Sequence, residues 1–159
     1  MKPNYLAWDI NYQDFDGQKT EADRLRFLLN FAVLAPSSHN SQPWMFQVSD
    51  NSINLLPDFK RSLTISDTNH RQLFLSLGCA LENLLIAADY YGYETEVTFF
   101  PQEDVAAHVR FKEKLSNHMP TDDHLVFSIS KRYTNRNKYT SEIPPDDFLR
   151  SIRSQADAD

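Results

Sequence analysis

Residues 35–44 read Ala-Pro-Ser-Ser-His-Asn-Ser-Gln-Pro-Trp and connect a strongly amphipathic segment to an apolar, alternating one. Two prolines, three serines, a histidine and two amides are concentrated in these ten residues. Such a composition is typical of a loop between a helix and a strand. Loops at such junctions commonly present binding groups on a rigid scaffold, so this stretch is the first candidate for a site.

The segment before this loop is predicted to be a core-facing helix. The run from Thr20 to Asp23 forms a capping-box pattern with aspartate in the acidic position. Apolar residues then recur at the spacing of one helix face, namely Leu25, Leu28, Leu29, Ala32 and Val33. Pro36 is expected to end this helix.

After the loop, two short apolar runs at 44–48 and 53–56 predict an antiparallel hairpin. The strongest helix prediction covers about Asn69 to Tyr91, with Gly92 suited to the position after its end. Its wide apolar face consists of Leu73, Leu77, Ala80, Leu81, Leu84, Leu85 and Ala88. Gly78 and Ala80 would permit the close approach of another backbone in mid-helix.

The second half of the chain predicts two more strands and two more helices. The strands cover 96–100 and 108–112, separated by a turn at Pro101. One helix runs from Asp122 to about Arg132 with Thr121 as its cap, and a last helix begins within 143–147. The fold class is therefore α+β, a mixed or antiparallel sheet packed by helices with the long helix central. Since one small sheet cannot cover that helix, we expect a homodimer that buries part of it.

Composition narrows the class of protein. The 159 residues suit one domain with a sizeable core, and 41% of them are hydrophobic. The net charge of −6, from 16 basic and 22 acidic residues, opposes nucleic-acid and membrane-surface binding. With three glycines instead of about eleven, a glycine-rich phosphate loop is excluded. We find no signal peptide at residues 1–10 and no run near the roughly 20 residues of a membrane span, and we expect a cytoplasmic protein.

The chain divides into three predicted parts. Residues 1–19 form an N-terminal arm, 20–131 a complete unit, and 132–159 the start of a truncated second unit. The division rests on a weak sequence similarity between residues 22–26 and residues 146–150. Cys79, the single cysteine, excludes an intrachain disulfide and is expected in the core. No metal site is predicted.

Two clusters carry the chemistry of a binding site, and each also has a purely structural interpretation. Ser37, Ser38 and Asn40 offer groups that donate and accept hydrogen bonds, or they close a helix end and an Asx-turn. His39 lacks partners for a triad or a metal site, so we expect no catalytic role for it. In the second cluster, Arg132, Thr134 and Arg136 can hold a phosphate, or Lys131 and Arg132 simply complement a helix dipole.

A third cluster lies at the start of the long helix. Asn69 and Arg71 are two polar residues that lead into it. Asn69 can cap the helix and Arg71 can pair with an acid on its first turns, which would make both structural.

These motifs together resemble the FMN-dependent nitroreductase superfamily. Residues 36–44 resemble its Pro-Ser-Ser-x-Asn-x-Gln-Pro-Trp segment, and 132–136 resemble its Arg-x-Ser-x-Arg signature with threonine for serine. The resemblance implies these cofactor-binding residues: Pro36, Ser37, Ser38 and Asn40 at the flavin ring; Arg132, Thr134 and Arg136 at the FMN phosphate and ribityl chain; Asn69 and Arg71 at the flavin or substrate edge. It is nearest to the two-repeat, Acg-like branch. In the family the arginine signature precedes the first helix, whereas here it begins the second unit.

What the resemblance implies about function is an oxidoreductase. NAD(P)H would reduce FMN by hydride transfer, and the flavin would reduce a nitroaromatic, a quinone or a similar small-molecule acceptor. An alternative is a non-catalytic flavin-binding, flavin-storing or dimerisation module of the same fold. A third interpretation is a plain α+β interaction domain.

Overall fold

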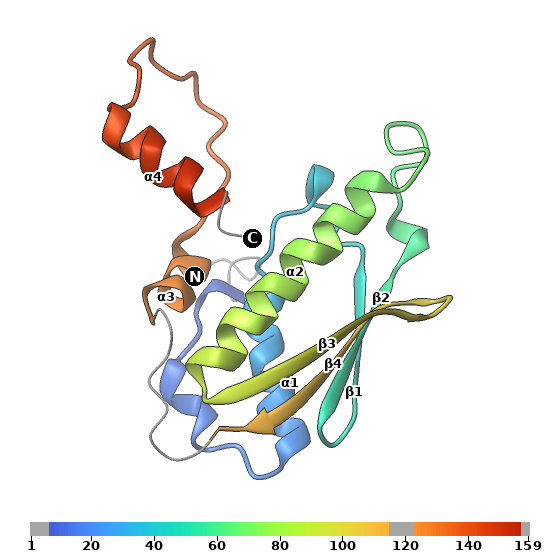
Figure 1. Ribbon diagram of the computed structural model, residues 1–159. Helices are drawn as coiled ribbons and strands as arrows, with labels where there is room; N and C mark the ends of the chain where they lie inside the picture. Colours follow the sequence, from blue (N-terminus) through green and yellow to red (C-terminus); the bar gives the residue numbers. More distant parts are fainter. Residues whose placement is uncertain (1–6, 115–122, 157–159) are drawn as a thin grey trace.

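The computed structural model describes residues 7–114 and 123–156, which form one antiparallel sheet packed by helices (Figure 1). In chain order the strands are β1 (Trp44–Val48), β2 (Ser52–Pro57), β3 (Tyr93–Gln102) and β4 (Val105–Glu113), and the helices are α1 (Glu21–Ala32), α2 (Arg71–Tyr90), α3 (Asp123–Lys131) and α4 (Asp146–Ala156). Short 3-10 turns cover Tyr12–Phe15, Ser38–Asn40 and Phe59–Arg61. The strand order is β1-β2-β4-β3, and α2 contacts all four strands while α1 and α3 pack against it. The predicted α+β class with a long central helix is confirmed.

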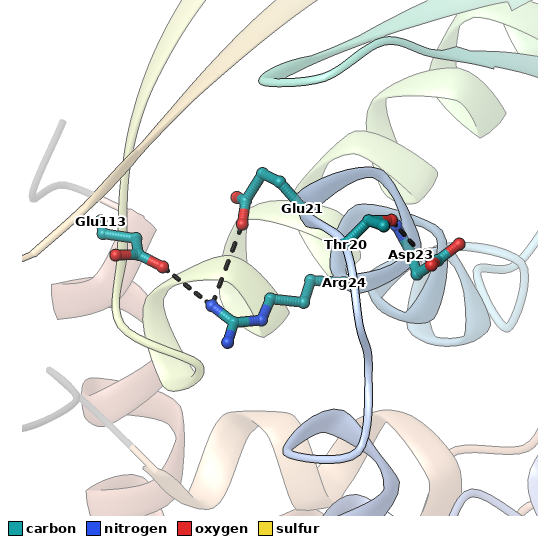
Figure 2. Close-up of polar contacts among 5 residues, drawn as sticks. All are labelled: Thr20, Glu21, Asp23, Arg24 and Glu113. Atoms are coloured by element: carbon teal, nitrogen blue, oxygen red, sulfur yellow. Dashed lines mark hydrogen bonds and ion pairs between the residues drawn. The ribbon is translucent and has the colours of Figure 1, made fainter.

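The start of α1 has the capping box that the sequence predicted. Thr20 Oγ1 accepts a hydrogen bond from the Asp23 amide at 3.1 Å and donates one to the Asp23 carboxylate at 2.7 Å. One turn further, Arg24 Nη1 lies 2.8 Å from a carboxylate oxygen of Glu113 and 3.9 Å from one of Glu21 (Figure 2). The first turn of α1 is thereby attached to the end of β4.

The buried face of α1 is wider than its predicted stripe. Leu25, Leu28 and Ala32 are buried as expected. Phe27 and Phe31, which the periodicity did not include, are buried as well. They meet rings from the N-terminal part and from the residue that follows α2: Phe27 lies 5.8 Å from Phe15 and 5.5 Å from Tyr91, and Phe31 lies 5.5 Å from Tyr12. Because rings from another part of the chain cover this side of α1, more of its residues are buried than one sheet would cover.

The long helix α2 lies within the predicted range and ends before Gly92, whose φ of 82° is the left-handed conformation expected after a helix. Its core face is buried and consists of Leu73, Ser76, Leu77, Ala80, Leu81, Leu84, Ala87 and Ala88. Among the described residues, α2 alone is long and apolar enough to meet a length-and-composition test for a membrane span. A buried core helix can have the same length and composition, and one face of α2 packs into the core here.

The two hairpins differ in how well the sequence predicted them. β1 and β2 pair in register from Trp44–Pro57 to Val48–Ile53, as expected. β3 and β4 are longer than predicted, and Pro101 lies inside β3 instead of in the turn, which falls at residues 103–104. The prediction of a turn at Pro101 was wrong because β3 is an edge strand, where a residue without an N–H is tolerated. The register shifts between Phe99 and Gln102, and Phe100 has a φ of 49°.

The chain after α3 leaves the body of the molecule. Residues 133–148 are exposed throughout, and α4 stands apart from the sheet and its helices (Figure 1). α4 begins at Asp146, within the predicted range and just after two prolines. The predicted cap at Thr121 lies outside the described residues. The division into a unit at 20–131 and a second unit from 132 stays a prediction.

Candidate functional site

A pocket of about 310 Å³ lies where the end of α1 meets the chain that leaves α3. It brings together residues from the two motifs that the sequence singled out, 96 positions apart: Pro36, Ser37 and Asn40 from the first, and Arg132, Thr134 and Arg136 from the second. Nothing local in the sequence joins these two segments. Their meeting depends on the packing of α3 against α1 and α2.

The loop after α1 holds an unusual backbone conformation at this pocket. His39, Asn40 and Gln42 all have positive φ, at 53°, 56° and 50°, which is uncommon for residues other than glycine. Ser37 closes the loop, since its Oγ accepts a hydrogen bond from the Gln42 amide at 2.9 Å and its carbonyl accepts one from the Asn40 amide at 3.0 Å. Strained backbone of this kind is often found where a protein holds binding groups in place.

Arg132 connects the loop to α3. Its Nη2 donates a hydrogen bond to the carbonyl oxygen of Leu34 at 3.1 Å, just beyond the end of α1. The guanidinium therefore lies at the negative end of the dipole of α1, whereas the structural interpretation expected Arg132 to complement the dipole of its own helix. Its Nε is buried and has no hydrogen-bond partner within the described parts of the chain. Arg132 thus has a fixed position and an unsatisfied donor.

The pocket is cationic. Arg132 and Arg136 line it, and no aspartate or glutamate is among its lining residues. Over residues 7–114 and 123–156, neither arginine forms an ion pair with a carboxylate. The hydroxyls of Ser37 and Thr134 and the amide of Asn40 add neutral hydrogen-bonding groups. Two arginines with nearby hydroxyls are suited to a phosphate or another anion.

Two aromatic residues at the pocket were missed by the sequence reasoning. Trp8 and Tyr133 both line it, and Tyr133 is 81% exposed. Aromatic faces beside a cationic pocket can cover a planar ring. Trp8 lies in the N-terminal arm, which has no periodic pattern, and no signal in the sequence pointed to it.

Three predicted site residues lie outside this pocket. Ser38 lies in the same loop but lines a narrow crevice toward residues 61–76. Asn69 and Arg71 are at the start of α2, where the Asn69 side chain accepts a hydrogen bond from the Arg71 amide at 3.3 Å. Arg71 lines a groove on the outer side of α2 instead. Within this one chain the third motif is therefore separate from the first two.

Asp67 supplies most of the cap of α2, and Asn69, which the structural interpretation expected in that role, adds only the longer contact to the Arg71 amide. The Asp67 carboxylate is buried and accepts hydrogen bonds from the Gln72 and Leu73 amides, both at 2.9 Å. His70 at the helix start has a φ of 57°, and its Nδ1 lies 2.9 Å from the Ser62 hydroxyl. In the part of the chain that the structure describes, no three histidine, cysteine, aspartate or glutamate residues gather in a way that could hold a metal ion.

No protein-family model matches the chain, but curated proteins do. It is 35% identical over 89 residues to "Putative NAD(P)H nitroreductase Rv3131" of Mycobacterium tuberculosis, covering 56% of this chain and 26% of that protein. It is 29% identical over 141 residues to "Putative NAD(P)H nitroreductase acg" of the same species, covering 86% of this chain and 42% of that protein. The matched part of the chain thus spans less than half the length of these relatives.

Solved structures share the fold. A "Putative NADH dehydrogenase/NAD(P)H nitroreductase" from Bacteroides thetaiotaomicron has a TM-score of 0.51 and 16% identity, covering 79% of this chain and 88% of that one. A "Putative NADH Oxidase" from Clostridium acetobutylicum has a TM-score of 0.51 and 18% identity, covering 85% of this chain and 99% of that one.

The fold defines an α+β protein of the nitroreductase-like type. The shared fold and the curated relatives named putative NAD(P)H nitroreductases support the nitroreductase superfamily that the motifs of this chain predicted. Its place in the two-repeat branch stays a prediction.

Proposed function

We propose that this chain acts in an FMN-dependent oxidoreductase that takes hydride from NAD(P)H and reduces a nitroaromatic, a quinone or a similar acceptor. The observation that carries the proposal is the pocket in which Arg132 and Arg136 meet the Pro36–Asn40 loop with no acidic lining residue. The names of the curated relatives support NAD(P)H as the reductant. When bound, FMN would supply the hydride acceptance and donation; the protein would bind and orient it.

The residues of the pocket fit the phosphate-bearing part of FMN. Arg132 and Arg136 would bind the phosphate, with Thr134 adding a hydroxyl donor. Ser37 and Asn40 would hydrogen-bond to polar groups of the cofactor. The buried Arg132 Nε, which lacks a partner among the described residues, supports an anionic ligand nearby. A volume of about 310 Å³ is at the small end for ligand pockets, which suits the phosphate and ribityl chain.

The remaining predicted residues belong to a larger site. Ser38, Asn69 and Arg71 lie outside the pocket of one chain, so we assign them to a site completed by a second copy. A homodimer that buries part of α2 would supply that copy. The expected location is cytoplasmic and the expected partner is a small-molecule electron acceptor, not nucleic acid or membrane, in keeping with the net charge of −6.

The test compares FMN with riboflavin, which lacks the phosphate, by quenching of flavin fluorescence. Arg136→Ala is the informative variant because Arg136 is exposed and supports no described contact. We expect it to weaken FMN binding at least tenfold and to leave riboflavin binding unchanged. Arg132→Lys retains the charge but cannot form a bidentate contact, so it should also weaken FMN selectively.

Arg110→Ala is the matched control, since Arg110 pairs with Glu96 on the sheet and does not line the pocket. It should bind FMN like the parent chain. Equal affinity for FMN and riboflavin, or an equal loss in the Arg110 variant, would contradict a phosphate site at these arginines.

A non-catalytic flavin-binding, flavin-storing or dimerisation module is the second candidate. It is favoured by the bond from Arg132 to the Leu34 carbonyl, which uses part of this arginine for structure. NAD(P)H oxidation by the FMN-loaded chain, with a quinone or nitroaromatic as acceptor, separates the two. Turnover supports the reductase, and bound FMN that NAD(P)H never reduces supports the second candidate.

A further inference from the structure

α2 has a second apolar stripe on the side turned away from the core. It follows helical spacing along one side and lines a groove of about 580 Å³, and its residues are Arg71, Phe74, Leu75, Gly78, Cys79 and Glu82. Leu75 is 55% exposed, and the Phe74 ring lies 5.8 Å from the exposed ring of Phe100 at the end of β3. We call this surface the outer stripe. An apolar surface of this kind is typical of a protein contact.

α4 has an apolar side that the described part of the chain leaves largely exposed. Phe148, Leu149 and Ile152 share one side of the helix, and Phe148 and Ile152 are 54% and 49% exposed. Asp147 and Arg150 form an ion pair on the opposite side. A helix of 11 residues is marginal in water without a packing partner, so α4 requires one.

The two surfaces match in length and shape. The 11-residue helix α4 spans about 16 Å, and the 12 positions from Arg71 to Glu82 span about 18 Å. Gly78 lies in the middle of the outer stripe, and a Cβ built there would meet nothing within 4 Å. The space above Gly78 can therefore accept a bulky side chain such as Phe148.

The charged residues at the two ends of the outer stripe and of α4 favour one relative direction of the two helices. The outer stripe begins with Arg71 and ends with Glu82, while α4 has Asp146 in its first turn and Arg153 in its last. None of these four residues forms an ion pair within the described ranges. A parallel alignment places opposite charges together at both ends, whereas an antiparallel one places like charges together.

From these observations we infer that α4 of one chain docks in parallel on the outer stripe of α2 in a second copy. In this chain α4 stands away from its own α2 (Figure 1), and residues 132–145 could reach about 45 Å when extended. A reciprocal exchange of α4 between two copies forms a closed twofold dimer. The inference specifies the contact of the homodimer in the proposed function, and it does not depend on flavin.

Disulfide trapping tests the contact directly because Cys79, the single cysteine of the chain, lies on the outer stripe. In the full chain carrying Ile152→Cys, mild oxidation should link most of the protein into a two-chain species on a non-reducing gel. Ser154→Cys, on the opposite side of α4, is the matched control and should remain near the parent level. Adding Cys79→Ser to Ile152→Cys should remove the linked species.

Three outcomes would overturn the inference. The first is a yield of the two-chain species in Ile152→Cys that is no higher than in the Ser154→Cys control. The second is a disulfide formed within one chain. The third is linkage of the parent chain through Cys79 alone, which would indicate that α2 packs on α2 of the second copy.

The charge pattern offers an independent test by analytical ultracentrifugation. Glu82→Arg and Arg153→Glu should each raise the dimer dissociation constant about tenfold or more, and the double variant should recover most of the loss. No recovery would contradict the parallel alignment. FMN titration of the same variants reports on the proposed function separately, since trapping without FMN binding would contradict the flavin site and leave this contact intact.

Discussion

Two regions of the molecule differ in the burial of their apolar side chains. They are the body, residues 7–114 with α3, and the C-terminal segment, residues 133–156. In the body, Leu25, Phe31 and Leu84 are fully buried. In the segment, Tyr139 and Ile143 are more than four-fifths exposed. The body thus buries a large apolar core within the chain and leaves only some apolar residues exposed, such as those of the outer stripe, whereas most large apolar residues described in the segment are exposed.

Because of this difference, we expect the body to determine the folding stability of one chain and the segment to determine its association with a second chain. Substitutions in the body should change unfolding, and substitutions in the segment should change contacts with a partner. The predictions below test that separation, beginning with the largest expected effect.

The largest effect is expected for Phe31→Ala. The Phe31 ring is fully buried and lies 5.5 Å from Tyr12 and 6.0 Å from both Phe27 and Tyr91. Its removal should cost about 3–5 kcal/mol of unfolding free energy, measured by urea denaturation. The matched control is Phe148→Ala in α4, measured at a protein concentration too low for association. It should change stability by less than about 0.5 kcal/mol, and a cost near that of Phe31 would remove the distinction between the two regions.

The second prediction compares an acid at a helix start in each region. Asp67→Ala should cost about 2 kcal/mol because the buried carboxylate accepts two amide hydrogen bonds at the start of α2. Asp147→Ala at the start of α4 should have an effect of at most about 0.5 kcal/mol, since its ion pair with Arg150 is exposed. Equal losses in thermal or urea unfolding would show that α4 is as firmly held as α2.

The third prediction concerns two tyrosines within the body. The Tyr91 hydroxyl donates a hydrogen bond to the Tyr12 carbonyl at 3.0 Å, so Tyr91→Phe should cost about 1 kcal/mol. The buried Tyr93 hydroxyl lies near Glu21 and Arg24 but forms no hydrogen bond of normal geometry within the described residues. Tyr93→Phe should therefore cost nothing or stabilise slightly.

The dependence of folding stability on alkaline pH provides a further test of the two tyrosines. Burial raises the pKa of both hydroxyls, which favours the neutral form in the folded chain. Stability should be unaffected below about pH 10, where tyrosine in the unfolded chain is still neutral, and should fall as the pH rises above that value. Either phenylalanine variant should reduce this fall, and an unchanged alkaline slope would contradict the expected burial.

The smallest effect is expected at the exposed start of α1. The hydrogen bond from Thr20, followed by interactions with Arg26, lowers the pKa of Asp23 below its ordinary value. The contribution of the Asp23 carboxylate to folding stability is therefore fully present above the pKa of aspartate in the unfolded chain, about 3.9. It is lost as the pH falls through the lower pKa of Asp23 in the folded chain. Asp23→Asn should destabilise slightly at pH 7, and the difference from the parent should disappear at pH 2. Asp104→Asn in the β3–β4 turn controls for the general loss of a negative charge.

Some of these features could be read from local patterns alone. The capping box at Thr20 and Asp23, the hairpin of β1 and β2, and the range of α2 depend on neighbouring residues and their periodicity. The motifs at 36–44 and 132–136 were also visible, the first as groups that donate and accept hydrogen bonds and the second as arginines able to hold a phosphate. The sequence by itself therefore determined these elements, the resemblance to the nitroreductase superfamily and most of the candidate groups, because each of these is a property of a short stretch of chain.

Tertiary structure decided which groups meet. It placed Arg132 against the carbonyl of Leu34 and formed one pocket from two distant motifs. It placed the Asp67 carboxylate at the start of α2, where it caps the helix. It also placed Arg71 outside the pocket, beside a groove on the exposed side of α2. These outcomes depend on contacts between residues far apart in the chain, and local periodicity contains no information on how separate elements pack.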